Sequence, residues 1–332
     1  MRNHVKVLSV IVLCLSAVVS SKAVERGLGV FHRGADSLVY TGYAPLAHKP
    51  VTLYYYIPTK GNIKNMPVLI TFHGADRHGN LPRDNWKDFA ERDGFIVLCP
   101  EFTRELYDEN QYQFGNVFKD RNSTELNPEE LWTYSIVEPI FDFFQAETGN
   151  KVATYSIQGH SAGGQFTHRY LIAKPDARVD VAVASNPGSW TWVSKDGIIG
   201  ESEESFNWPY TLKGTPFADD RHIEAYLKRD LTVHLGDADT LRTGPNVPRD
   251  AASLAEGAYR YERGRNYFEA SREFASQNGL GFGWNMVVVK GVGHRGKGMV
   301  YARSHRNENG ERQYDVNQIR QTGAYWIIYG NQ

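Results

Sequence analysis

Residues Gly159–Gly163 read Gly-His-Ser-Ala-Gly and carry the strongest chemical signal in this sequence. They follow an apolar run, Val152–Ile157, that predicts a strand, and Ser161–Ala173 has the pattern of a helix. A tight turn between the two would lift the Ser161 hydroxyl clear of a sheet, and its glycines would let strand and helix approach closely. Ser161 is therefore a candidate nucleophile. A plain glycine-rich turn with a helix-capping serine is the alternative.

A serine hydroxyl is a poor nucleophile at neutral pH, so it needs a base and an acid that orients the base. The strand-like run Leu231–Leu235 leads into Asp237 and Asp239, and Trp284–Lys290 leads into His294. The order Ser, Asp, His is one of the known orders of such a triad. We predict His294 as the base and favour Asp239 as the acid, because it lies farther into its loop. Asp237 is the alternative acid, and otherwise a turn former.

The attacked carbonyl oxygen becomes negatively charged, and backbone N–H groups usually stabilise that charge. One donor is expected at Ala162, directly after the nucleophile. The second is expected in the loop after the strand that ends at Phe72, where Ala75 is favoured and Gly74 is the alternative. The sequence thus predicts an oxyanion hole formed by Ala75 and Ala162.

His73, Asp76 and His78 could instead bind a metal ion. No second cluster at ligand spacing accompanies them, so we predict neither a metal site nor a cofactor. The chain has 37 basic and 38 acidic side chains, which leaves no net field to attract nucleic acid or an anionic membrane. Neither is an expected partner.

Apolar runs alternate with amphipathic segments along the chain, which predicts an α/β fold with a mostly parallel central sheet and helices on both faces. Expected strands are 51–57, 66–72, 95–99, 152–157, 179–184, 231–235 and 284–290. Expected helices are 84–92, 128–148, 161–173, 220–228, 252–277 and 318–328. Residues 103–127 show no clear period and predict a long surface loop, which either borders a binding site or has no role in one.

The first 23 residues have the layout of a secretory signal peptide, with Arg2 and Lys6 ahead of the apolar run Val7–Val19. That run is too short to span a bilayer core of roughly 30 Å, so no stable membrane anchor is expected. We predict an exported protein, periplasmic or extracellular, with residues 24–332 as a single catalytic domain. Without the leader only Cys99 remains, so no internal disulfide is expected.

Five segments together carry a family likeness: 73–77, 100–102, 159–164, 165–170 and 291–294. The chain after residue 50 resembles exported bacterial α/β-hydrolases of the poly(3-hydroxybutyrate) depolymerase and feruloyl esterase type. The resemblance implies the α/β-hydrolase fold and carboxylic-ester hydrolysis through an acyl-enzyme, with Ser161, Asp239 and His294 at the triad positions. The chain lacks the disulfides and polymer-binding domain of better-known members, which argues against an insoluble polyester as substrate.

Two groups of residues could contact a substrate. Trp190 and Trp192 follow the expected strand 179–184 and could stack on a phenolic or sugar ring, although tryptophans also pack loops against a core. Basic residues of the helix 252–277 could bind a carboxylate, but a solvated helix face is the favoured interpretation. These residues are Arg260, Arg263 and Arg265, with Glu262 among them.

The preferred hypothesis is a serine carboxylic-ester hydrolase for a small or medium acyl or aryl ester, possibly linked to polysaccharide or a hydroxyalkanoate. A serine peptidase with the same triad is an alternative. A non-catalytic carbohydrate-binding relative, which would use Trp190 and Trp192, is another.

Overall fold

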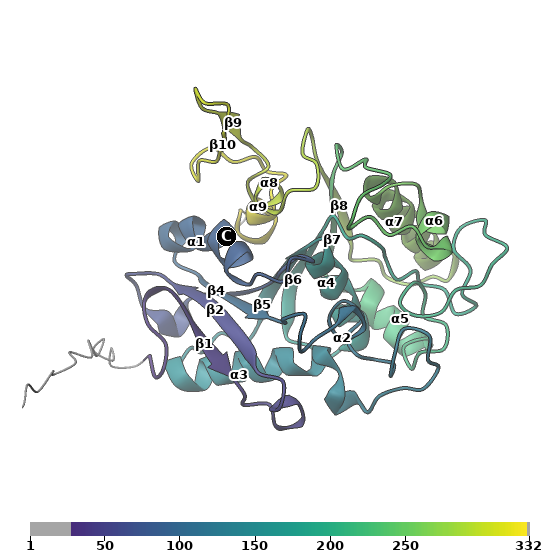
Figure 1. The fold of residues 1–332 in the computed structure, drawn as a ribbon, viewed down its shortest axis with the longest axis horizontal. Coiled ribbons are helices and arrows are strands. Elements are labelled where there is room, and N and C mark those ends of the chain that lie inside the picture. The colour runs from purple at the N-terminus through teal and green to yellow at the C-terminus, as the bar shows by residue number, and fades with distance from the viewer. Residues whose placement is uncertain (1–27, 331–332) are drawn as a thin grey trace, which may run out of the picture.

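The computed structural model describes residues 28–330, and its centre is an eight-stranded sheet in the order β1-β2-β4-β3-β5-β6-β7-β8 (Figure 1). Strands β1 and β2, and β2 and β4, pair antiparallel, and the other neighbours are parallel. The predicted mostly parallel sheet is therefore confirmed. The strands are β1 (Gly34–Tyr40), β2 (Val51–Ile57), β3 (Val68–Phe72), β4 (Ile96–Glu101), β5 (Tyr155–His160), β6 (Val179–Ser185), β7 (Leu231–Gly236) and β8 (Asn285–Val289).

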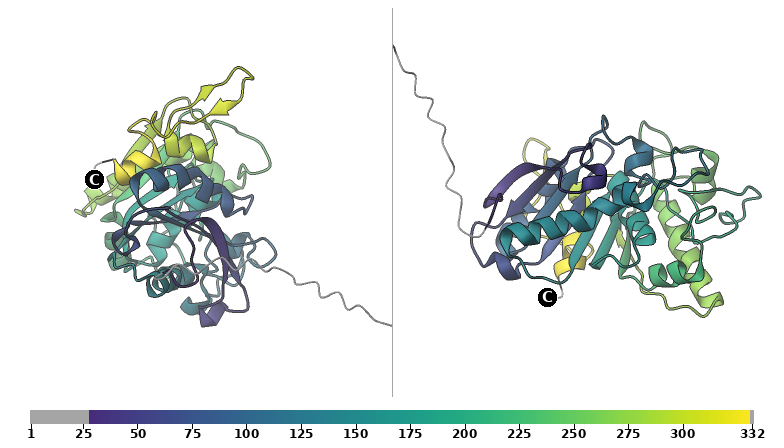
Figure 2. Two further views of the ribbon diagram at one scale, coloured as in Figure 1. Left: turned by 90° about the vertical axis from the view of Figure 1, so that its left-hand side faces the viewer. Right: turned by 90° about the horizontal axis from the view of Figure 1, so that it is seen from below.

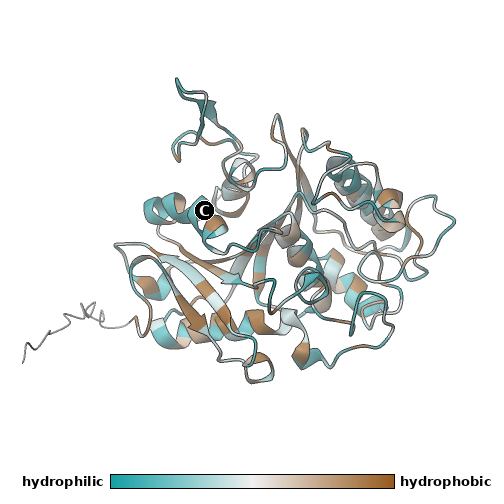
Figure 3. Cartoon of the chain, in the orientation of Figure 1, coloured by the Kyte–Doolittle hydropathy of each residue, from teal (hydrophilic) through white to brown (hydrophobic). Residues whose placement is uncertain are grey.

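Helices cover both faces of this sheet, and successive residues of each strand point to opposite layers. Val68 and Ile70 of β3 belong to the larger core with α3, α4, α5 and α7, whereas Leu69 packs with α1, α8 and α9. Strand β3 is accordingly buried at every position, whereas β1 at the edge of the sheet alternates between exposed and less exposed residues. Figure 3 shows hydrophobic residues in the central strands. The helices are α1 (Asn80–Asp93), α2 (Glu109–Tyr112), α3 (Val137–Thr148), α4 (Ala162–Ala173), α5 (Asp220–Leu227), α6 (Ala251–Glu256), α7 (Arg260–Gln277), α8 (Gly296–Tyr301) and α9 (Ala324–Tyr329).

Several predicted boundaries are wrong for local reasons. The predicted helix 252–277 is two helices, because the chain turns at Gly257 with φ 150° between α6 and α7. The predicted helix 128–148 begins as two short 3-10 turns and becomes α3 only at Val137. The loop 103–127 includes α2 and is not simply a surface loop, because Tyr107 and Tyr112 are fully buried in the main core. Strand β1 and helix α8 have no counterpart in the prediction.

Strands β3, β5, β6, β7 and β8 are parallel neighbours, so their carboxyl ends meet at one edge of the sheet. The loops that leave β3, β5, β7 and β8 at this edge contain Gly74, Ser161, Asp239 and His294. The topology therefore gathers residues that are far apart in the sequence.

Outside this core, a small hairpin of β9 (His305–Arg306) and β10 (Arg312–Gln313) projects from the body of the molecule (Figure 2). The predicted signal peptide, residues 1–23, lies outside the described residues. Within residues 28–330, none of the helices combines the length and the apolar character needed to cross a membrane.

Two core histidines are held neutral by burial. His168 of α4 donates from Nδ1 to Gly164 O (3.0 Å) and accepts the Thr191 N–H at Nε2 (3.1 Å). His234 of β7 donates from Nε2 to Thr322 O at 2.8 Å. Desolvation holds the pKa of His168 well below its usual value of 6.5 and lowers the pKa of His234 to about 4. Protonation of His168 at Nε2 would also break the bond that this atom accepts from the Thr191 N–H.

The fold should therefore lose stability in mild acid. As the pH falls through 6.5, these histidines become protonated in the unfolded chain but stay neutral in the folded chain. The free energy of unfolding therefore falls as the pH falls. His234, whose pKa is lowered to about 4, should by itself cost about 2 kcal/mol between pH 7.5 and 5. Urea unfolding at pH 7.5 and pH 5 measures this, and His234→Gln should reduce the loss whereas His305→Gln, at an exposed position, should not. Equal stability at the two pH values would contradict the prediction.

Candidate active site

Ser161 stands in the turn between β5 and α4 with φ 60° and ψ −118°, a left-handed conformation that non-glycine residues rarely adopt. The neighbouring glycines are required by close backbone contacts. A Cβ at Gly159 would lie 2.1 Å from Gly163 O, and a Cβ at Gly163 would lie 2.2 Å from Phe72 O. The predicted tight turn is present, and it is packed too closely for any larger residue at these two positions.

Ser161, His294 and Asp239 form one hydrogen-bonded chain. His294 Nε2 lies 2.9 Å from Ser161 Oγ, and its Nδ1 lies 2.6 Å from Asp239 Oδ2. An ionised carboxylate only accepts, so Nδ1 carries the proton and Nε2 is free to accept the serine proton. Asp237 lies elsewhere, where its Oδ1 accepts the Gly291 N–H at 2.7 Å and closes a turn. The structure thus brings together the three residues that we favoured from the sequence.

The predicted oxyanion donors lie beside Ser161. Ala162 is the first residue of α4, so its N–H has no partner within the helix, and it lines the same cavity as Ala75 and Ser161. Gly74 is also close, since a Cβ built on it would lie 4.0 Å from Ser161 Cβ. Both Ala75 and Gly74 therefore remain candidates for the second donor.

The loop that carries these donors is fixed by His73. Its Nδ1–H donates to Gly74 O at 3.0 Å, and its Nε2 accepts the Phe102 N–H at 2.9 Å. Tyr112 stacks on the ring and donates to His73 O at 2.7 Å. Burial lowers the pKa of His73 to about 3, so the ring is neutral and keeps both bonds at physiological pH. With the donors held in place, this arrangement suits nucleophilic attack on an acyl group.

No family model and no curated protein matches this sequence. Among solved structures, poly(aspartic acid) hydrolase-1 from Sphingomonas sp. KT-1 is 33% identical, with a TM-score of 0.73 over 81% of this chain and 96% of its own. LpqC, a poly(3-hydroxybutyrate) depolymerase from Bordetella parapertussis, is 32% identical, with a TM-score of 0.72 over 81% of this chain and 88% of its own. This chain belongs to the α/β-hydrolase family.

A third structure, the S-formylglutathione hydrolase FrmB from Staphylococcus aureus, is 14% identical with a TM-score of 0.50, over 80% of this chain and 94% of its own. It shows a similar fold and no more. The predictions of an α/β-hydrolase fold and of a hydrolase enzyme are confirmed.

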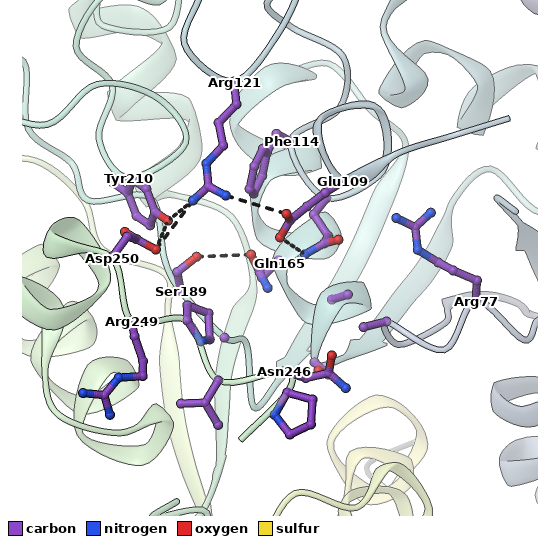
Figure 4. Close-up of a pocket in the computed structure, with 18 of the residues that line it drawn as sticks. Arg77, Glu109, Phe114, Arg121, Gln165, Ser189, Tyr210, Asn246, Arg249 and Asp250 are labelled. Atoms are coloured by element: carbon purple, nitrogen blue, oxygen red, sulfur yellow. Dashed lines mark hydrogen bonds and ion pairs between the residues drawn. The ribbon is translucent and has the colours of Figure 1, made fainter. Parts of the chain in front are cut away.

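A cavity of about 430 Å³ opens beside Ser161 of this α/β-hydrolase (Figure 4). The loop 103–127 borders it, together with the start of α4 and the segment 245–250. On one wall, Arg121 lies 2.9 Å from Tyr210 Oη, 3.5 Å from Asp250 and 3.7 Å from Glu109. Arg121, Tyr210 and Asp250 also line a second cavity of about 410 Å³, so this cluster divides two adjacent hollows.

A second histidine, His160, packs against His294 with 4.6 Å between ring centroids. The residue is half-buried, but its Nε2 is enclosed and has no hydrogen-bond partner among residues 28–330. Burial and the nearby His294 hold the pKa of His160 well below its usual value, so the ring is neutral. In the described part of the chain, no group of three or more His, Cys, Asp and Glu side chains is placed to hold a metal ion.

Arg260 is a site residue that the sequence pattern did not reveal. We expected a solvated helix face, but Arg260 is buried, and its Nη1 lies 3.2 Å from Asp239 Oδ1. One oxygen of the carboxylate thus faces His294 and the other faces Arg260. Residues 260, 263, 267, 271 and 275 of α7 are all buried, so extending the apolar pattern of Tyr267 backwards would have placed Arg260 inside.

The two tryptophans do not lie where a substrate could reach them, so their predicted role is wrong. Trp190 is fully buried and stacks on Tyr267 with ring centroids 4.6 Å apart, and its backbone N–H donates to Glu256. Trp192 is 8% exposed and, like Trp190, is absent from the lining of the cavity at Ser161. Packing of the loop after β6 against α7 explains the burial of Trp190, and Trp192 is bridged through its backbone to Tyr210 and Thr211.

Replacing Arg260 by Met should slow the reaction of Ser161 with a fluorophosphonate by roughly 10–100-fold. The reason is that Asp239 loses a charge-assisted hydrogen bond and no longer holds His294 in place. The labelling rate measured by mass spectrometry reports this. In an Asp239→Asn background the same replacement should add little, because the two residues act as a unit. Independent, multiplying losses would show that Arg260 does not act through Asp239.

Proposed function

We propose that this α/β-hydrolase is a carboxylic-ester hydrolase that works through an acyl-enzyme. The observation that carries the proposal is His294, whose two ring nitrogens lie within hydrogen-bond distance of Ser161 and Asp239. An imidazole that bridges a strained serine and a buried carboxylate has the geometry of a general base that activates a nucleophile. Ser161 is then the nucleophile, His294 the base and Asp239 the acid.

The reaction follows from these positions. Ser161 Oγ attacks the carbonyl carbon while His294 Nε2 takes its proton, and the oxygen becomes an anion that the N–H of Ala162 and that of Ala75 or Gly74 stabilise. His294 then returns the proton to the departing alcohol, which leaves an acyl group on Ser161. A water molecule then attacks the acyl carbon while His294 takes one of its protons. The bond between that carbon and Ser161 Oγ breaks, His294 returns the proton to Oγ, and the acid is released. Asp239 stabilises the imidazolium in both halves.

The substrate class is proposed from two lines of support. Two of the solved structures described above are more than 30% identical to this chain; one is named for poly(3-hydroxybutyrate) and the other for poly(aspartic acid). The cavity beside Ser161 holds a small or medium group, and the adjacent second cavity leaves room for a longer chain. We therefore propose a small or medium acyl or aryl ester, free or attached to a polymer. Amide hydrolysis is the second candidate, because of the likeness to poly(aspartic acid) hydrolase-1.

A non-catalytic carbohydrate-binding role has less support. The surface proposed for it consisted of Trp190 and Trp192, and both side chains are buried. Export to the periplasm or the medium remains a proposal that rests on residues 1–23 alone.

A fluorophosphonate probe should add one label to the protein, at Ser161, and Ser161→Ala should take none. The wild type should then hydrolyse aryl and alkyl esters, and the variant should be slower by roughly four orders of magnitude or more because the proton-transfer unit is broken. Intact-mass spectrometry and an ester panel with matching anilides measure this. Faster turnover of the anilides would favour the amide candidate, and folded protein without any label would favour a binding role.

The two aspartates of the loop after β7 should differ sharply. Asp239→Asn should lower kcat by about 10³- to 10⁴-fold, because the amide would no longer hold His294 in the right tautomer. Asp237→Asn keeps an oxygen that can accept the Gly291 N–H, so it should change kcat by less than about tenfold. Steady-state kinetics of the two variants on one ester decides the matter. The reverse order would make Asp237 the acid.

A further inference from the structure

The floor of the cavity beside Ser161 holds a polar network that the reaction itself does not use. Gln165 lies on α4, one turn after Ser161, and is 5% exposed. Ser189, from the loop after β6, lies beside it, and both line the cavity (Figure 4). Behind them lies Arg169, which is fully buried and has no carboxylate within ion-pair distance in residues 28–330.

The hydrogen bonds of this network fix which way the Gln165 amide points. Arg169 Nη1 donates to Gln165 Oε1 at 2.8 Å, and Ser189 Oγ donates to the same oxygen at 3.1 Å. Arg169 Nη2 in turn donates to Ser189 Oγ at 3.0 Å. A guanidinium has only donors, so the amide oxygen must face it, and the amide nitrogen must point away.

The Gln165 nitrogen is therefore a donor that waits for an acceptor. Within residues 28–330, nothing accepts a hydrogen bond from Gln165 Nε2. Trp190 Nε1 also lacks a partner, but that atom is enclosed. Gln165 Nε2 is open to the cavity. The buried positive charge of Arg169 behind the amide oxygen polarises the group and makes its N–H a stronger donor.

The position of His294 tells which part of a substrate meets this donor. The departing alcohol must lie beside His294 Nε2, from which it receives its proton. His294 is not among the residues that line the cavity, whereas Ser161, Ala75 and Ala162 are. The cavity therefore receives the acyl part of the substrate.

The geometry points to Gln165 as a specificity residue that donates from Nε2 to a second carbonyl or carboxylate oxygen on the acyl group. Arg169 and Ser189 act as positioning residues, because they hold the amide in the donating orientation. One helical turn rises about 5.4 Å, so the second oxygen should be a few bonds from the attacked carbonyl. The inference rests on the proposed ester hydrolysis and narrows its substrates to oxygen-bearing acyl groups over plain alkyl ones.

Two esters that differ only in one carbonyl test this: p-nitrophenyl 4-oxopentanoate and p-nitrophenyl pentanoate. Wild-type protein should prefer the oxo ester in kcat/KM by about tenfold, the value of one hydrogen bond. Gln165→Glu keeps the shape and can still accept from Arg169, but it places an acceptor where the donor was. The preference should then fall by about tenfold or more. Ser189→Ala, which removes one of two supports, should reduce it a few-fold.

Gln111→Glu is the matched control, because it adds the same charge to α2 at a side chain that does not line the cavity. Gln111 Oε1 accepts the Asp108 N–H at 3.2 Å, which a glutamate oxygen can still do, so the preference should stay within about twofold of wild type. Fluorophosphonate labelling and thermal unfolding confirm that each variant is folded and reactive.

The outcomes distinguish a failure of the role of Gln165 from a failure of the proposed ester hydrolysis. Hydrolysis of both esters with a preference that Gln165→Glu leaves unchanged would overturn the role of Gln165 and leave ester hydrolysis intact. An equal effect of Gln111→Glu and Gln165→Glu would assign the preference to charge alone and would also overturn it. Labelled wild-type protein that cleaves neither ester would remove the proposed function, and the inference with it.

Discussion

The backbone turn at Ser161 is the constraint on which the site depends. A left-handed conformation at a residue with a side chain costs of the order of 1–3 kcal/mol and persists only where the surroundings determine it fully. Here those surroundings are the sheet below and helix α4, all of whose residues, 162–173, are buried. The contacts at Gly159 and Gly163 leave no room for the turn to relax. Strain at the nucleophile is therefore held by a fully buried helix and its close contacts with the sheet.

The parallel sheet brings the triad residues together, and this part of the site could be predicted from the sequence. Each triad residue follows a short apolar run, and the ends of parallel strands must meet at one edge. The periodicity of apolar residues in the sequence is therefore enough to predict that Ser161, Asp239 and His294 lie near one another. Their loops also explain the preference between the aspartates, because Asp237 is used to close the turn to Gly291.

The residues that could not be predicted are buried polar ones, and the reason is physical. Arg260 and Gln165 look like the solvated side of a helix, because hydropathy patterns assign charged and amide groups to water. Burial of these polar groups is tolerated because each has a hydrogen-bond partner, Asp239 for Arg260 and Arg169 for Gln165, which offsets the free energy of desolvation. The error at Trp190 is the converse, since a loop tryptophan gives no sign of whether it faces a cavity or packs on a distant helix.

Buried arginines also stabilise the loops that form the walls of the cavity. Loop carbonyls that are removed from water need donors, and a guanidinium provides five in a fixed plane. Arg77 donates to the carbonyls of Phe102 and Tyr107 on one side of the cavity. Arg263 donates to those of Gly188 and Pro248 on the other. Each arginine thus joins segments that are distant in the sequence.

The electrostatics around His294 complete this logic. During the reaction His294 becomes positively charged, and His160 lies 4.6 Å away from it, ring to ring. A protonated His160 would oppose that charge, but its burial keeps the ring neutral. Arg260 is the other cation nearby, and it faces the oxygen of Asp239 that His294 does not use. The positive charge on His294 therefore develops against one carboxylate, Asp239, whose orientation Arg260 helps to fix, while the neighbouring His160 ring stays neutral.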